Sequence, residues 1–171
     1  GEYEPRVIDN MNTTKGDRLS APMSAHIYPT YKCNENCFFC YNKTKQHLHI
    51  MTSEQFEKTC KLIDELYAMG VPTLNFLGGE PLIYFSSLIE LLNYSNNRFY
   101  LGLASNGVGD VRFTEERSKL LRNISNLDIR ISLHSIDAQT HDSIVGYKGA
   151  FDRALISIKN LVKYGVRCTW S

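Results

Sequence analysis

The stretch LDIRISLHS, residues 127–135, decides between the architectures open to this chain. Its side chains alternate strictly between apolar and polar. The apolar side holds Ile129, Ile131 and Leu133, and the polar side holds Arg130, Ser132 and His134. A central strand of a doubly wound sheet is covered by helices on both faces and is apolar throughout. This strand is apolar on one face only, which favours helices on the outside and a polar, ligand-filled interior.

Strand-like and helical patterns alternate on both sides of that stretch. The predicted strands are 24–30, 73–81, 99–107, 127–135 and a fifth that begins at 166. The predicted helices are 51–70, 86–94, 114–124 and 150–165. This order predicts an α/β fold with parallel strands and right-handed crossovers, as a doubly wound sheet or as a barrel or part-barrel. Residues 1–20 lack periodicity and are interpreted as a lead-in, and residues 21–171 as one domain that ends within strand five.

Two helices carry detailed predictions. In the first, Thr52 and Gln55 form a capping box and Gly70 ends the helix. Its apolar stripe is Phe56, Cys60, Ile63, Leu66 and Tyr67. The last helix ends at Gly165, and its stripe is Phe151, Ala154, Leu155, Ile158, Leu161 and Val162.

Composition excludes several classes of protein. The chain has 171 residues, 43% hydrophobic and 22% charged, with a formal net charge of +1. That charge gives no reason to expect nucleic acid as a partner. No stretch approaches the roughly 20 apolar residues of a membrane span, and the polar, acidic start does not read as a signal peptide. We therefore expect a cytoplasmic protein with reduced thiols.

Polar and glycine-rich features follow the strands at their carboxyl ends. They are the cysteines of 33–40, Gly78-Gly79-Glu80-Pro81, Ser105-Asn106-Gly107, and Ser132 with His134. Because the carboxyl ends of parallel strands meet at one edge, we expect these features to form a single site. Each feature also has an alternative interpretation without a functional role. These are a tight turn for the glycines, ordinary turn hydrogen bonding for Ser105-Asn106, and a core position for His134.

Three of the five cysteines lie within CNENCFFC, residues 33–40. A structural zinc site has four protein ligands, so Cys33, Cys37 and Cys40 would need a histidine such as His47 or His49. Three thiolates on a four-iron cube instead leave one iron open to a substrate or cofactor. Phe39 is placed to shield such a cluster on one side. Cys60 and Cys168 are interpreted as small core residues.

The pattern Cys33-x-x-x-Cys37-x-Phe39-Cys40 after a first strand resembles the signature of the radical S-adenosylmethionine (SAM) superfamily. The stretches CYN, GGEP, SNG and SLHS follow in the order of that family's further motifs, over roughly residues 20–171. Among the branches of this family, the sequence is most similar to the peptide- and protein-modifying branch of the SPASM or twitch type. The family often has an acidic residue at the position of His134.

The resemblance implies a partial (βα)₆ barrel, here truncated after about four βα units. It implies a 4Fe–4S cluster on the three cysteines, SAM on its open iron, and reductive cleavage to a 5′-deoxyadenosyl radical that abstracts hydrogen from a substrate. Gly78, Gly79 and Glu80 would meet the SAM amino group, and Ser132 the ribose. Ser105 and Asn106 would lie near the methionyl or ribose end.

Two partners follow from the same resemblance. A one-electron donor such as flavodoxin or ferredoxin would reduce the cluster, and a peptide or protein side chain is a candidate substrate. The rival hypothesis is a zinc-stabilised α/β binding module without redox chemistry. Metal and sulfide analysis separates the two hypotheses.

Overall fold

The computed structural model describes residues 21–45 and 51–171, and in these residues five parallel strands form one sheet. The strands are β1 (Ser24–Thr30), β2 (Thr73–Gly78), β3 (Tyr100–Ser105), β4 (Leu127–Ile131) and β5 (Cys168–Trp170). They lie in the sheet in chain order, and each neighbouring pair is parallel. A doubly wound sheet reverses its strand order at a switch point. The unbroken order therefore confirms the part-barrel over the alternative.

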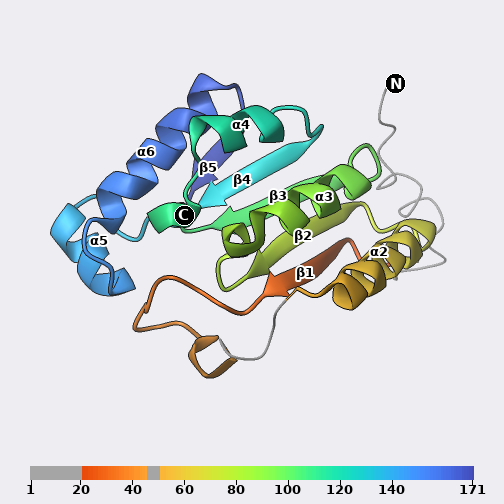
Figure 1. The fold of residues 1–171 in the computed structure, drawn as a ribbon, viewed down its shortest axis with the longest axis horizontal. Helices are drawn as coiled ribbons and strands as arrows, with labels where there is room; N and C mark the ends of the chain where they lie inside the picture. The colour runs from red at the N-terminus through yellow and green to blue at the C-terminus, as the bar shows by residue number, and fades with distance from the viewer. Residues whose placement is uncertain (1–20, 46–50) are drawn as a thin grey trace, which may run out of the picture.

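Helices connect the strands and cover one side of the sheet (Figure 1). They are α2 (Ser53–Ala68), α3 (Phe85–Ser95), α4 (Glu115–Leu121), α5 (Ala138–Val145) and α6 (Ala150–Lys163). Short 3₁₀ turns occupy η1 (Lys43–Lys45), η2 (Pro81–Tyr84) and η3 (Gly109–Val111). Among the described residues, none of these helices has the length and apolar character needed to cross a membrane.

The alternation read from residues 127–135 extends across the sheet. On the helix-covered face the strands bury Leu74, Phe76, Leu101, Leu103, Ile129 and Ile131. The register pairs these side chains in rows, for example Leu103 with Ile129. The opposite face, called the inner face below, carries Asn75, Gly102, Asp128 and Arg130. The predicted polar interior is thus one face of the sheet.

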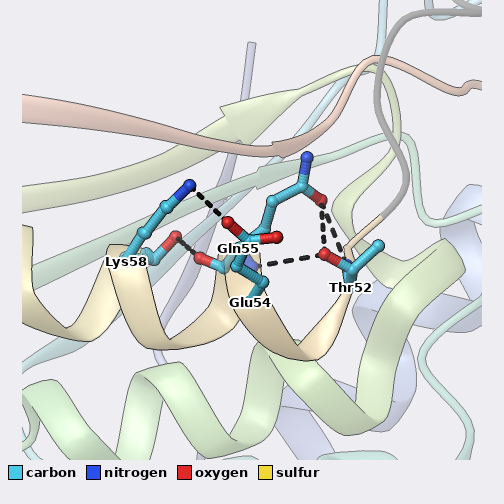
Figure 2. A network of polar contacts seen from close by, with 5 residues as sticks. Thr52, Glu54, Gln55 and Lys58 are labelled. Carbon is cyan, nitrogen blue, oxygen red and sulfur yellow. Dashed lines mark hydrogen bonds and ion pairs between the residues drawn. The ribbon is translucent and has the colours of Figure 1, made fainter.

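The capping box of the first helix is present as predicted. The Thr52 hydroxyl accepts from the Gln55 backbone N–H at 3.2 Å, and the Gln55 side chain accepts from the Thr52 N–H at 3.1 Å (Figure 2). Lys58 and Glu54 add an exposed ion pair one turn along (Figure 2). Gly70, just after the end of α2, takes the positive φ that favours glycine.

Several details differ from the sequence prediction. The strand expected over 127–135 ends at Ile131, so Ser132 and His134 lie just after β4 and not within it. Helix α5 was not predicted, because it is short and buries only His141 and Val145. Val162 was placed on the apolar stripe of α6, but its side chain is 63% exposed. Ser157 is buried on that helix instead, because its hydroxyl accepts from the Phe113 N–H at 3.2 Å. Cys60 and Cys168 pack against the core, as predicted.

The carboxyl ends of β2 and β3 are joined through the buried carboxylate of Glu80. One carboxylate oxygen accepts from the Ser105 hydroxyl at 2.8 Å and from the Leu82 N–H at 3.0 Å. The other accepts from the Asn106 N–H at 2.7 Å. Burial raises the pKa of Glu80 to about 7, against the opposing effect of the N–H groups of Asn106 and Leu82.

Leu161 and Val162 give a matched test of the helix packing. Leu161→Ala should lower the free energy of unfolding by about 2–5 kcal/mol, because it leaves a cavity in the core. Val162→Ala should change it by less than about 0.5 kcal/mol, because the valine is largely exposed. Urea unfolding of both variants measures the difference. Equal losses would contradict the observed orientation of α6.

The pKa of Glu80 gives a pH dependence of stability. Its folded value of about 7 lies above the ordinary 4.5, so the stabilisation is full below about pH 4.5 and is lost as pH rises through 7. Within that window the slope approaches about 1.4 kcal/mol per pH unit for one group. In urea unfolding from pH 5 to pH 8, Glu80→Gln should flatten this slope, because it removes the Glu80 titration and also the Glu80 charge that raises the pKa of Glu35. Identical slopes in the two proteins would show that Glu80 does not titrate in this range.

Candidate functional site

A cavity of about 270 Å³, called the cluster cavity below, lies at the edge where the carboxyl ends of the strands meet. The predicted site residues that line it are Cys33, Cys37, Phe39, Cys40, Gly78, Gly79, Ser105, Asn106, Ser132 and His134. They come from the segments that follow β1, β2, β3 and β4. Glu80 is the exception: it is fully buried behind the wall, bonded to the end of β3. The structure therefore brings the four sequence features together.

The loop between β1 and η1, residues 31–42 and called the cysteine loop below, directs backbone N–H groups toward its own sulfur atoms. The Glu35 N–H lies 3.5 Å from Cys33 Sγ, and the Asn42 N–H lies 3.4 Å from Cys40 Sγ. N–H donors of this kind stabilise a thiolate and tune iron–sulfur centres. Burial raises the pKa of Cys33 to about 12 and that of Cys37 to about 11. Both thiols therefore keep their protons at neutral pH unless a metal displaces them.

Gly78 and Gly79 allow the cysteine loop to lie against the end of β2. The Gly79 N–H donates to the Thr30 carbonyl at 2.9 Å, and the Glu80 N–H donates to the Lys32 carbonyl at 2.7 Å. A Cβ on Gly78 would collide with the Thr30 carbonyl, and one on Gly79 with the Lys32 carbonyl. Gly78 also has a φ of +137°, which side chains rarely adopt. Any larger residue here would push the cysteine loop away.

The other side of the cysteine loop lies against α5 (Figure 1). The Asn36 N–H donates to the Val145 carbonyl at 2.9 Å, and the Phe38 N–H donates to the Ile144 carbonyl at 3.2 Å. These carbonyls belong to the last turn of α5, where helical acceptors have no partner within the helix. This contact is not predicted from the sequence, because α5 itself is not predicted. Asp137 at the start and Gly146 at the end were the available signals.

Asparagines hold the cysteine loop to the end of β3. The Asn106 amide donates to Asn34 Oδ1 at 2.8 Å and lies 3.8 Å from Cys33 Sγ. The Asn34 amide donates in turn to the Val108 carbonyl at 2.9 Å. Asn106 was a predicted site residue and Asn34 was not. The side chain of Asn106 thus faces the first cysteine.

Two further residues of the cavity wall were missed. Asn42 donates to the Gly78 carbonyl at 3.0 Å, but its buried Oδ1 accepts no hydrogen bond from the described residues. Glu35 is also buried; one of its oxygens faces Cys37 Sγ at 3.7 Å and the other has no donor in the described part of the chain. Buried acceptors without donors are costly. These two atoms favour a ligand that donates hydrogen bonds.

His134 lies at the far wall of the cluster cavity. Its ring meets Phe39 edge-to-face, with 5.0 Å between centroids. Its backbone N–H donates to His141 Nδ1 at 3.2 Å, and the two histidine rings stack. Burial lowers the pKa of both His134 and His141, so both are neutral near pH 7. His134 therefore links the cysteine loop to α5.

The donor set argues against a single metal ion. In residues 21–45 and 51–171, no three His, Cys, Asp or Glu side chains are arranged to hold one ion. Thiolates on a four-iron cube each bind a different iron, so they lie farther apart than ligands around one zinc. His47 and His49, named for the zinc alternative, lie outside the described residues.

Curated relatives are similar over most of this chain. It is 30% identical over 159 residues to the antilisterial bacteriocin subtilosin biosynthesis protein AlbA of Bacillus subtilis, covering 91% of this chain and 34% of AlbA. It is 33% identical over 164 residues to the mycofactocin maturase MftC of Mycolicibacterium smegmatis, covering 94% of this chain and 38% of MftC. The chain therefore spans little more than a third of the length of these relatives.

Solved structures share the fold. Streptococcus suis SuiB bound to S-adenosylmethionine superposes with a TM-score of 0.76 at 20% identity, covering 94% of this chain and 36% of SuiB. The anSMEcpe structure with bound AdoMet gives a TM-score of 0.68 at 22% identity, covering 87% of this chain and 43% of that one. Residues 27–171 match the family model described as the radical SAM superfamily, whose members use a 4Fe–4S cluster and SAM. This chain belongs to the radical SAM superfamily.

Proposed function

We propose that this chain is the catalytic core of a radical SAM enzyme that modifies a peptide. The convergence of the three cysteines with the ends of β2, β3 and β4 on one cavity is the observation that carries the proposal. When bound and reduced by one electron, the cluster and SAM supply a 5′-deoxyadenosyl radical that abstracts hydrogen from the substrate. The chain's own residues bind, orient and shield these groups.

Cys33, Cys37 and Cys40 are the proposed cluster ligands. The N–H groups of Glu35 and Asn42 would stabilise the first and third thiolates, and the Asn106 amide adds a third donor near Cys33. Phe39 lines the cavity beside Cys40 and would exclude water from one side of the cluster. Hydrogen bonds to the sulfurs and limited solvent access are levers that set a cluster's potential.

The same cavity suits a cationic, donor-rich ligand such as SAM. Asn42 Oδ1 and one carboxylate oxygen of Glu35 lack donors among the described residues, and the Glu80 carboxylate is buried just behind the wall. A ligand ammonium and sulfonium would offset the negative potential of these groups. We assign Gly78 and Gly79 to the amino group, and Ser132 to the ribose. Glu80 would position Ser105 and Asn106 at the cavity wall through its hydrogen bonds to them.

A peptide is the proposed class of substrate. The relatives named above are a bacteriocin biosynthesis protein and a mycofactocin maturase, and SuiB has also been solved bound to its precursor peptide SuiA.

A one-electron donor such as flavodoxin or ferredoxin belongs to the proposal, because each SAM cleavage consumes one electron. Exposed Phe38 and Tyr41 offer apolar surface beside the cysteine loop. Reduced thiols favour the cytoplasm.

Domain organisation and the type of branch remain proposals. The predicted lead-in, residues 1–20, lies outside the described residues, and we propose that residues 21–171 are the first part of the barrel. A SPASM or twitch extension in the whole protein would agree with the short share of the relatives that this chain covers.

Anaerobic reconstitution tests the cluster assignment. The wild-type chain should take up about four irons with acid-labile sulfide and turn brown. A variant with Cys33, Cys37 and Cys40 changed to alanine should lose nearly all of that iron. Cys60→Ala, on α2 and packed against the core, is the matched control and should keep it. Equal iron in the triple variant would refute the assignment, and one zinc without sulfide would favour the binding module.

Ser132 gives a test of the SAM site that is separate from the cluster. Ser132→Ala should weaken SAM binding about three- to tenfold, the effect of losing one hydrogen bond, and leave iron content unchanged. Anaerobic equilibrium dialysis measures the affinity. Ser143→Ala, an exposed serine on α5, is the control. Unchanged affinity in the Ser132 variant would remove that residue from the site.

A further inference from the structure

A second cavity, of about 230 Å³ and called the inner trough below, runs along the inner face of the sheet. Its lining includes Asn75, Leu77, Gly102, Ala104, Asp128 and Arg130. These side chains come from β2, β3 and β4. The inner trough lies opposite the helix-covered face, so the hydrophobic core does not need it for packing.

The floor of the inner trough is lowest along β3. Gly102 has no side chain, and a Cβ there would collide with Asn75 Oδ1. Asn75 therefore lies flat across β3, and its amide donates to the Ser24 hydroxyl at 2.8 Å. Ala104, two residues further along β3, keeps the floor low toward the site. The hollow is thus built by small residues and by a fixed asparagine.

The inner trough carries net positive charge. Its charged lining residues are Asp128, Arg130 and Arg167. Arg167 Nε lies 3.9 Å from Asp128 Oδ1, so these two charges offset each other. Arg130 is exposed on the inner face and makes no ion pair with any side chain of the described residues. An exposed guanidinium without an ion pair can bind a carboxylate through two parallel hydrogen bonds.

The inner trough is continuous with the cluster cavity. Leu77 and Ala104 line both of them. Arg130 lies on β4, and Ser132 directly follows the last residue of that strand, where its N–H still pairs with the Ser105 carbonyl at 3.0 Å. Two residues of extended backbone span about 7 Å. A ligand group held by Arg130 would therefore place neighbouring atoms at the mouth of the cluster cavity, where the proposed chemistry occurs.

We propose that the inner trough is a substrate subsite in which Arg130 pairs with the carboxylate of an acidic side chain in the peptide. The proposal rests on the proposed function for the nature of the substrate. It assigns Arg130 as a residue that determines specificity and positions the peptide along β4. The low floor at Ala104, next to the Asn75 side chain that lies over Gly102, admits the peptide, and the Arg130 charge selects the acidic residue.

Ligand-observed saturation-transfer NMR on the intact chain tests the subsite with matched probes. The probes are N-acetyl-glutamate N-methylamide, its glutamine analogue, and glutarate. The wild type should prefer the blocked glutamate over the blocked glutamine by about two- to fivefold, the range of an exposed ion pair, and salt should weaken the preference. Arg130→Gln should abolish it, and Arg130→Lys should retain part of it because the charge remains.

Arg122→Gln is the control, since Arg122 is exposed after α4 and lies outside the inner trough. It should keep the wild-type preference. The subsite is overturned if the wild type shows no preference, if Arg130→Gln keeps it, or if Arg122→Gln loses it equally. Tighter binding of glutarate than of the blocked glutamate would overturn the peptide as the source of the carboxylate.

SAM binding by the wild type is measured separately, by anaerobic dialysis. The probe titrations need neither cluster nor SAM, so they report on the inner trough alone. A wild type that binds no SAM but prefers the glutamate probe would overturn the proposed function and leave the carboxylate subsite standing. A wild type that binds SAM but does not prefer the glutamate probe would overturn the carboxylate subsite and leave the proposed function standing.

Discussion

The buried carboxylate of Glu80 is the constraint on which the site depends. A fully buried carboxyl group is costly unless each oxygen is hydrogen-bonded. Here the three donors come from η2 just after Glu80 and from the end of β3. Satisfying Glu80 therefore requires the ends of β2 and β3 to meet in one arrangement. That arrangement presents Gly78, Gly79 and Asn106 on a single wall.

The cysteine loop is positioned by both of its neighbours and by its own backbone. On one side it pairs with the turn after β2, at a distance that only glycine permits. On the other side it donates to the last carbonyls of α5. A loop of this length has high conformational entropy when free. Contacts to elements more than 40 residues and more than 100 residues away in the chain are what hold its three thiols on one cavity.

The two cavities of the carboxyl edge and inner face have opposite electrostatic character. The wall of the cluster cavity holds two acceptors without donors in the described residues, Glu35 Oε1 and Asn42 Oδ1. The inner trough has one such acceptor, Asp128 Oδ1, but it also carries Arg167 and Arg130, and Arg130 makes no ion pair with the described residues. In the proposed enzyme, the difference in charge between the adjoining cavities would keep the cationic cofactor and the acidic substrate residue each on its own side. The division follows from the end of β4: Arg130 on the strand lines the inner trough, and Ser132 just after the strand lines the cluster cavity.

Local pattern in the sequence determined the elements and the order of the motifs. Strand periodicity at 127–135, the Thr52–Gln55 capping box and the glycines after β2 all depend on neighbours within a few residues, so they could be predicted. The tertiary structure alone decided that Glu80 faces β3 rather than the cavity, that Asn42 and Glu35 belong to the wall, and that α5 supports the cysteine loop. It also decided that Val162 faces solvent, although the helical period places it beside the stripe. Each of these depends on contacts between residues far apart in the chain, and no local period records them.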